Sequence, residues 1–307
     1  MELDTNLLQE LCAVPGTSGD EGLVKVFILK YIEKNCKSWL VIPEIYHGEG
    51  FQNCIILKFG NPRTAIFAHI DTIGFTTRYQ NQLVPIGGPD VEDSHILVGI
   101  DNLGDIECTL QKDSENRLFH DFARPIESGT NLTFKCNFSE SDHEVTSCYL
   151  DNRLGVYNAL KVAEILTDGV IVFSTWEEHG GGSVPFLIKF VYENWKVSKA
   201  LISDITWTTD GVQPGNGVAI SIRDKHIPRK LFIDRIISLA TDSGINFQLE
   251  VEGNGSSDGR EIQLSPYPID WCFIGAPEEN VHSPQETVHK KDIESMVKMY
   301  SYLMRNL

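Results

Sequence analysis

Short apolar runs rich in β-branched residues alternate with stretches of helical periodicity along most of this chain. Six such runs predict strands: CIILKF (54–59), AIFA (65–68), VIVFST (170–175), ALIS (200–203), VAISI (218–222) and WCFIGA (271–276). Apolar residues at helical spacing predict helices at 3–13, 21–35, 152–167, 183–194, 228–243 and 290–305. This alternation predicts an α/β fold, a three-layer α/β/α sandwich with helices on both faces of a central, mostly parallel mixed sheet.

The segment at 78–147 departs from this alternation. It contains the short strand-like runs HILVGI and NLTFKCNF, many turn residues and no helical pattern. We therefore expect a small all-β insertion domain at 78–147, inserted into a larger domain formed by 1–77 and 148–307. The sequence has no Pro-rich linker around the insertion, so we expect the insertion to pack against the larger domain.

Charge and cysteine usage disfavour several classes of partner and site. The chain has 26 Lys and Arg against 43 Asp and Glu, a net charge of -17 that disfavours nucleic acid and anionic membranes. Its first residues, MELDTNLLQELCAVPG, lack the pattern of a signal peptide, and no segment approaches the ~20 apolar residues that span a bilayer. The seven cysteines are scattered without a CxxC pair, which predicts reduced thiols in a cytoplasmic protein.

Charged or imidazole side chains follow several of the predicted strands. They are His69 and Asp71 after AIFA, Glu177 and Glu178 after VIVFST, Asp204 after ALIS, and His282 shortly after WCFIGA. Asp151 joins them from the expected N-cap of the helix at 152–167. Because sites in open α/β sheets form at the carboxyl ends of the strands, we expect these side chains to lie together at one edge of the sheet.

Each of these residues also has an ordinary structural explanation. Asp151 alone would be a helix cap, His282 a histidine in a surface loop, and Asp204 a turn former at a strand end. Together, their carboxylates would repel one another unless a cation lies among them. Two histidines and several carboxylates without a thiolate suit two hydrolytic ions, Zn²⁺, Co²⁺ or Mn²⁺. Of the adjacent glutamates, one could then bind a metal and the other take a proton from metal-bound water.

Seven short segments form a pattern that extends over nearly the whole chain. They are PGTSGDE (15–21), AHIDTIGF (68–75), IGGPD (86–90), LDNRLGV (150–156), WEEHG (176–180), SDIT (203–206) with GNGVAI (215–220), and VHSPQETV (281–288). In this order they resemble the motifs of the M42 glutamyl/leucyl aminopeptidases, a family of co-catalytic zinc exopeptidases. The chain departs from the family pattern at His179, which replaces an apolar residue, and at GGS (181–183), which replaces LRG.

The resemblance implies a role for each residue at the predicted sheet edge. Glu177 would be the general base, and Asp71 would accept the second N–H of a ligand histidine and so fix the tautomer of its ring. The larger domain, 1–77 and 148–307, would be the catalytic metallopeptidase domain. The implied metal ligands are His69, Asp151 and Asp204 on one ion and Asp151, Glu178 and His282 on the other.

The leading hypothesis is a dinuclear metalloaminopeptidase that releases N-terminal residues from short peptides by attack of a metal-bound hydroxide. It implies two divalent ions per subunit, Zn²⁺ first with Co²⁺ or Mn²⁺ as alternatives, and a homo-oligomer. One alternative is a metal-dependent deacylase or amidohydrolase that acts on N-acyl amino acids, and another is a non-catalytic binding protein on the same fold. The preferred N-terminal residue stays open: Lys225 and Arg260 could face an acidic substrate, although surface solvation is the commoner location of single basic residues.

Overall fold

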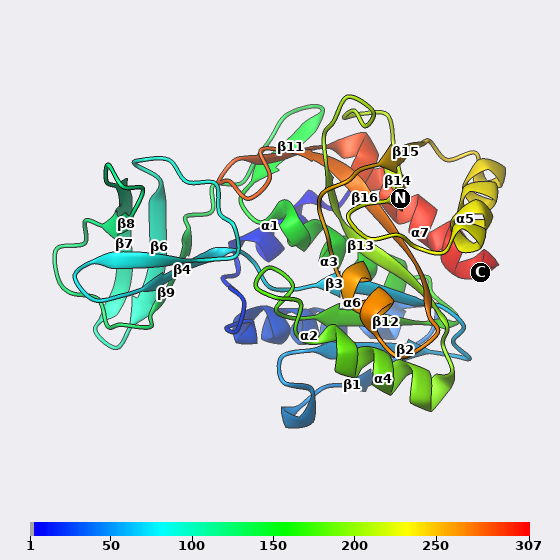
Figure 1. Cartoon of the computed structure of the whole chain (residues 1–307). Helices are drawn as coiled ribbons and strands as arrows, with labels where there is room; N and C mark the ends of the chain where they lie inside the picture. Colours follow the sequence, from blue (N-terminus) through cyan, green and yellow to red (C-terminus); the bar gives the residue numbers. More distant parts are fainter. Residues whose placement is uncertain (1–2) are drawn as a thin grey trace.

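An 11-stranded mixed sheet forms the centre of the computed structural model, which describes residues 3–307 (Figure 1). Its strands are β1 (Glu44–Tyr46), β2 (Ile55–Phe59), β3 (Ala65–His69), β10 (Ser139–Glu140), β11 (Glu144–Ser147), β12 (Gly169–Ser174), β13 (Lys199–Trp207), β14 (Val218–Arg223), β15 (Phe247–Val251), β16 (Asp270–Glu279) and β17 (Glu286–His289). They lie in the order β1-β2-β12-β3-β13-β16-β17-β11-β10, and β14 and β15 branch from β16. The central strands β12, β3, β13 and β16 are parallel, and antiparallel strands extend the sheet on both sides.

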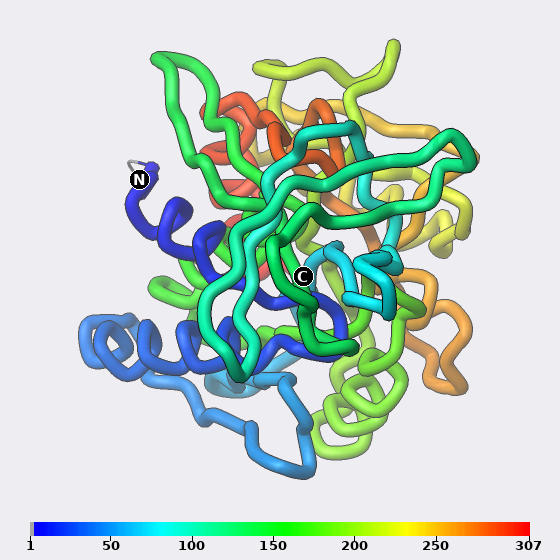
Figure 2. The backbone as a smooth tube through the Cα atoms, turned by 90° about the vertical axis from the view of Figure 1, so that its left-hand side faces the viewer, coloured from blue at the N-terminus to red at the C-terminus, as the bar shows by residue number. Residues whose placement is uncertain are grey.

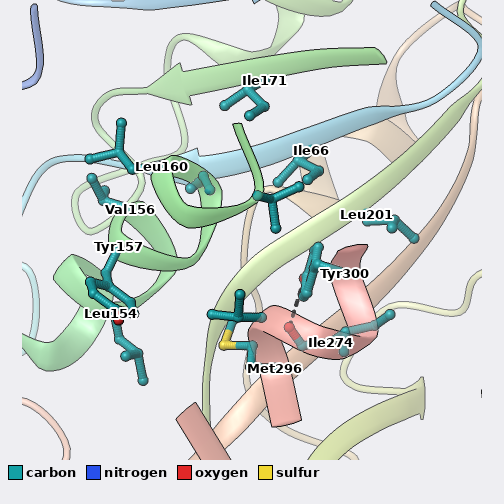
Figure 3. Packing of buried hydrophobic residues seen from close by; sticks show 14 of the residues in the cluster. Ile66, Leu154, Val156, Tyr157, Leu160, Ile171, Leu201, Ile274, Met296 and Tyr300 are labelled. Atoms are coloured by element: carbon teal, nitrogen blue, oxygen red, sulfur yellow. Dashed lines mark hydrogen bonds between the residues drawn. The ribbon is translucent and has the colours of Figure 1, made fainter. Parts of the chain in front are cut away.

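Helices cover both faces of this sheet because successive side chains of each strand point to opposite faces. Ile66, Leu201 and Ile274 pack into the larger core together with Tyr300, whose hydroxyl donates to the carbonyl of Ile274 (Figure 3). Helices of this face are α1 (Thr5–Ala13), α2 (Gly22–Asn35), α3 (Leu150–Ala163), α5 (Lys230–Ser243) and α7 (Lys290–Asn306). The opposite core contains Phe67 and is covered by α4 (Val184–Trp195) and α6 (Gly259–Leu264). Short 3₁₀ helices, η1 (Cys36–Ser38) and η2 (Glu49–Phe51), lie between α2 and β2.

The predicted α/β/α architecture is confirmed, and the structure corrects the extent of two strands. β13 and β16 pair over nine residues, from Lys199 with Asp270 to Trp207 with Glu278. Asp204 therefore lies within β13, and not after its end as the sequence predicted. The apolar run ALIS predicts only the first part of the strand, because Asp204 and Thr206 interrupt the apolar pattern, whereas the backbone pairing continues to Trp207.

A closed barrel of six strands lies beside the layered unit, on the left of Figure 1 and facing the viewer in Figure 2. Its strands are β4 (Gly74–Thr77), β5 (Gln82–Ile86), β6 (Ile96–Asp101), β7 (Gly104–Lys112), β8 (Leu118–His120) and β9 (Asn131–Phe134). Phe75, Leu97 and Leu132 are among the residues that fill its interior. The barrel strands thus span 74–134, while β10 and β11 belong to the large sheet. The division of the chain into domains at 78 and 147 stays a prediction.

The structure also bears on the predictions about membrane spans and cysteines. Within residues 3–307, no helix combines the length and the apolar character needed to cross a membrane. All seven cysteines are free thiols, and five of them are buried.

Candidate active site

Five side chains from five segments of the chain meet at the carboxyl edge of the central strands. Asp151 is shared by two groups of potential metal ligands, and the ligand atoms within each group lie within 4.8 Å of one another. The Nε2 atom of His69 is 3.3 Å from Oδ1 of Asp151, and the Nε2 atom of His282 is 3.2 Å from Oδ2 of the same carboxylate. The groups are His69, Asp151 and Asp204, and Asp151, Glu178 and His282.

The separations among these atoms fit the ligand set of a divalent ion. In a tetrahedral zinc site with bonds of about 2.0–2.2 Å, neighbouring ligand atoms lie about 3.3 Å apart. Nε2 of His69 is 3.5 Å from Oδ2 of Asp204, and Nε2 of His282 is 3.3 Å from Oε2 of Glu178. Oδ1 of Asp151 and Oε1 of Glu178 are buried and accept no hydrogen bond from any described residue. A bound cation would satisfy both oxygens.

Burial makes this concentration of negative charge costly without a cation. Burial and, second, the neighbouring charge of Asp151 raise the pKa of Glu178 to about 7, although the contact with His282 opposes them. Burial also raises the pKa of Glu177 well above its ordinary value. For His282, burial lowers the pKa, but the contacts with Asp151 and Glu178 outweigh it and bring the pKa to about 12. All three shifts indicate that the cluster takes up positive charge, as protons or as metal ions.

Glu177 lies beside the two ligand groups without belonging to either. Its Oε2 atom is 4.0 Å from Nε2 of His69. The Asp71 carboxylate holds the loop that carries both glutamates, because it accepts the backbone N–H groups of Glu177 and Glu178 at 3.1 Å each and the Ser18 hydroxyl at 2.6 Å. Nδ1 of His69 faces the Asp71 backbone carbonyl at 3.2 Å and its carboxylate at 3.5 Å. Asp71 therefore contacts the histidine ring and also positions the two glutamates. The sequence did not indicate the second of these roles.

Three non-glycine residues at or next to the site have left-handed backbone conformations. They are Tyr149 (φ 65°), Trp176 (φ 62°) and His282 (φ 66°). Such a conformation costs about 1–2 kcal/mol for an L-residue, so the surrounding contacts must hold it in place. At Trp176 it bends the chain out of the β12 direction, which lets the two glutamates that follow line the same cavity.

Asp151 does not cap α3, so the predicted N-cap role is wrong. Asp151 (φ -78°, ψ 106°) and Asn152 (φ -119°, ψ 39°) are not helical, and the peptide bond between them is cis. The side-chain oxygen of Asn152 accepts the backbone N–H of Gly155 at 2.9 Å, which is the hydrogen bond of a helix N-cap. The Asp151 carboxylate is instead turned toward the two histidines.

Two buried residues outside the predicted set hold the ligands in place. Glu286 accepts the backbone N–H of Asp151 at 3.2 Å on Oε2 and that of His282 at 2.9 Å on Oε1. It thus connects the shared ligand with a ligand from another loop. The Ser257 hydroxyl donates to Oδ2 of Asp204 at 2.6 Å. Glu286 lies in the segment VHSPQETV. The sequence analysis considered the polar residues that follow strands, and it missed Glu286 because this residue is the first of a strand.

Arg153 supports the site from behind and was also missed. Its side chain is fully buried, and its guanidinium donates to the backbone carbonyls of Leu11 at 3.1 Å and Val14 at 3.0 Å. A third hydrogen bond goes to the carbonyl of Ile70, the residue after His69. A buried arginine satisfied by carbonyl oxygens cannot be distinguished in sequence from an exposed one on the same helix.

Comparisons with known proteins agree with this fold and with the motifs. Residues 120–299, which are 180 of the 307 residues, match the M42 glutamyl aminopeptidase family model. A protein of Acetivibrio thermocellus, provisionally named an aminopeptidase, is 25% identical over 331 residues that cover 96% of both chains.

Two solved structures extend the likeness to the whole fold. A TET aminopeptidase from the marine sediment archaeon Thaumarchaeota archaeon SCGC AB-539-E09 superposes with a TM-score of 0.87 at 17% identity, over 99% of this chain and 97% of that chain. The TET1 peptidase of Pyrococcus horikoshii, which can assemble into a tetrahedron or a large octahedral shell, gives 0.81 at 21% identity, over 98% of each.

The fold and the family match together define an enzyme that hydrolyses peptides, of the aminopeptidase class. The chain belongs to the M42 glutamyl aminopeptidase family. The roles of the individual site residues stay predictions.

We expect Glu286→Ala to destabilise the protein, because it leaves two buried backbone N–H groups without an acceptor. Each such loss costs about 1–3 kcal/mol, so the free energy of unfolding should fall by about 2–6 kcal/mol. Glu286→Gln keeps the volume and one acceptor and should lose about half as much. Urea unfolding followed by circular dichroism with excess Zn²⁺ measures both. The exposed neighbour variant Glu279→Ala is the control; a Glu286→Ala stability equal to that of this control contradicts the role.

Proposed function

We propose that this protein is a dinuclear metal-dependent aminopeptidase that releases N-terminal residues from short peptides. The observation that carries the proposal is that the Asp151 carboxylate is shared by two groups of nitrogen and oxygen ligands, with Glu177 beside them. Two histidines and several carboxylates without a thiolate favour Zn²⁺, with Co²⁺ or Mn²⁺ as alternatives. We assign His69, Asp151, Glu178, Asp204 and His282 as the residues that hold the two ions.

When bound, the two ions would polarise the scissile carbonyl and make water a better nucleophile at neutral pH. The protein's own contribution is assigned to Glu177, which takes the proton of the attacking water and passes it to the departing amine. Burial raises the pKa of Glu177, and a raised pKa favours a carboxylate that must both accept and release a proton near neutral pH. Asp71 keeps this base in place through the Glu177 backbone N–H.

A panel of aminoacyl p-nitroanilides tests the proposal. We expect hydrolysis by protein loaded with Zn²⁺ or Co²⁺, loss of activity on chelation, and recovery when metal is added back. The same substrates with an N-acetyl group should not be cleaved, because the free amine is the feature that an aminopeptidase must recognise. Preference for N-acyl amino acids would instead support the deacylase alternative. If metal-loaded protein cleaves no free-amine substrate, the peptidase proposal is wrong.

The base assignment is tested by Glu177→Gln, which keeps the shape of the side chain and removes its basicity. We expect kcat to fall by about 10²–10⁴-fold, the usual contribution of a general base, while the metal content per chain stays unchanged. Glu178→Gln should lower the metal content as well, which separates a ligand from a base. The exposed variant Glu10→Gln serves as the control. Turnover by Glu177→Gln at the rate of this control would rule out the assignment.

We propose further that the chain forms a homo-oligomer. In support, the β6–β7 hairpin of the barrel exposes two large apolar side chains, Ile100 (67% exposed) and Leu103 (77% exposed). Apolar side chains exposed next to each other often mark an interaction surface. Size-exclusion chromatography with light scattering should give a multiple of the 34.4 kDa chain mass. The double variant Ile100→Asp, Leu103→Asp should give a smaller species, and a monomeric wild-type protein at micromolar concentration would contradict the proposal.

A further inference from the structure

The cavity that contains the candidate site continues beyond it to three more carboxylates. It has a volume of about 300 Å³, and its far end is lined by Asp224, Glu250 and Glu252. Asp224 follows β14, Glu250 lies in β15, and Glu252 follows β15. Asp224 is 8% exposed and Glu250 is 4% exposed, so two of these three side chains are buried. The Thr206 hydroxyl donates to the Glu250 carboxylate and ties this end to β13.

The carboxylates at the far end have no lysine or arginine paired with them among the described residues. No lysine or arginine is among the residues that line the cavity. Within residues 3–307, Asp224 has a single ion-pair partner, Nδ1 of His226 at 3.8 Å, and no ion pair forms to Glu250 or Glu252. Two divalent ions would balance the four carboxylates at the inner end, which holds the two ligand groups and the proposed base. The three carboxylates at the far end would remain uncompensated.

The inner end of the cavity is built to receive a ligand. Asp151 and Glu178 line it, and one oxygen of each, Oδ1 of Asp151 and Oε1 of Glu178, is buried without a hydrogen-bond partner among the described residues. An aminopeptidase must hold the free amine and the scissile carbonyl at these groups. The rest of the peptide has no fixed length and must leave toward solvent. The side chain of the first residue stays in the cavity and is the part of the substrate that can face Asp224, Glu250 and Glu252.

The cavity also has apolar residues in its lining. Ile205, Trp207 and Phe273 line the cavity along with the charged groups. A long basic side chain has the matching composition, because its methylene groups pack on apolar walls while its charged end reaches a polar site. A carboxylate at the far end would instead meet three like charges.

We propose that this enzyme selects peptides with a basic N-terminal residue, Lys or Arg, whose cationic group is bound by Asp224, Glu250 and Glu252. This inference rests on the proposed aminopeptidase function. The two basic residues that could have served an acidic substrate do not line this cavity. Arg260 lines a neighbouring cavity, where its guanidinium donates to the Glu261 carboxylate at 2.5 Å.

Comparing kcat/KM for Lys, Arg, norleucine, Leu and Glu p-nitroanilides with metal-loaded enzyme tests the proposal. Lys should exceed norleucine, which has an alkyl chain without the ammonium group, by about tenfold or more, as expected for hydrogen bonds to a charged group. The advantage should fall as ionic strength rises. Binding without turnover gives a second measurement: lysinamide should raise the Tm of the protein more than norleucinamide at equal concentration.

Variants locate the effect at the far end of the cavity. Asp224→Asn and Glu252→Gln, singly and together, should reduce the Lys-to-norleucine ratio of kcat/KM, with the double variant losing about tenfold. Glu10→Gln, an exposed acid outside the cavity, should keep the wild-type ratio. Circular dichroism and metal content verify that each variant is folded and loaded.

The outcomes separate this proposal from the function on which it rests. Hydrolysis of the Leu substrate without a Lys preference, or a ratio unchanged in the double variant, overturns the specificity and leaves the aminopeptidase function intact. Preference for the Glu substrate also overturns it and would point to Arg260 as the specificity residue. No hydrolysis of any substrate overturns both proposals.

Discussion

The mutual repulsion of buried carboxylates is the constraint on which the rest of this structure depends. Asp151, Glu178 and Asp204 approach one another at the edge of the central sheet, where water cannot screen them. The protein opposes this repulsion with two imidazoles and with hydrogen bonds from neighbouring groups. Asp71 and Glu286 add two more buried acids, but they accept backbone N–H groups and thereby position the loops of the cluster. What remains unbalanced is the charge that a pair of divalent ions would supply.

Parallel strand order explains how side chains far apart in the chain reach the same place. Ser174 of β12 pairs with His69 of β3, so the loop with the two glutamates begins beside the ligand histidine. The left-handed backbone of Trp176 and the Asp71 carboxylate then direct both glutamates into one cavity. Two adjacent residues can therefore differ in role: one belongs to a ligand group, and the other lies beside it as the proposed base.

In our proposals, one set of residues in the cavity carries out the reaction and another set selects the substrate. The candidate ligands lie within or shortly after the central strands or at the start of α3, elements that pack in the core. The acids at the far end belong to β15 and to the connections that follow β14 and β15 at the side of the sheet. Such connections vary more easily than the core, so members of one family can keep the same reaction and differ in the residue that they release. Under the proposed selectivity, the acids at the far end would favour a basic N-terminal residue, and the family name would not describe the substrate of this member.

Local patterns in the sequence determined the alternation of strands and helices and the residues that follow the central strands, because periodicity and strand ends depend on near neighbours. The resemblance to the family motifs added the proposal that these residues divide between two ions. Only the tertiary structure decided that Asp151 turns away from its helix, that Asp71 and Glu286 hold the site loops, and that Asp224 and Glu250 share its cavity. Glu250 lies within β15, a strand that the sequence analysis did not predict, and Asp224 lies in the connection that follows β14. Such features depend on pairing between distant segments, and no local pattern specifies which distant segments will meet.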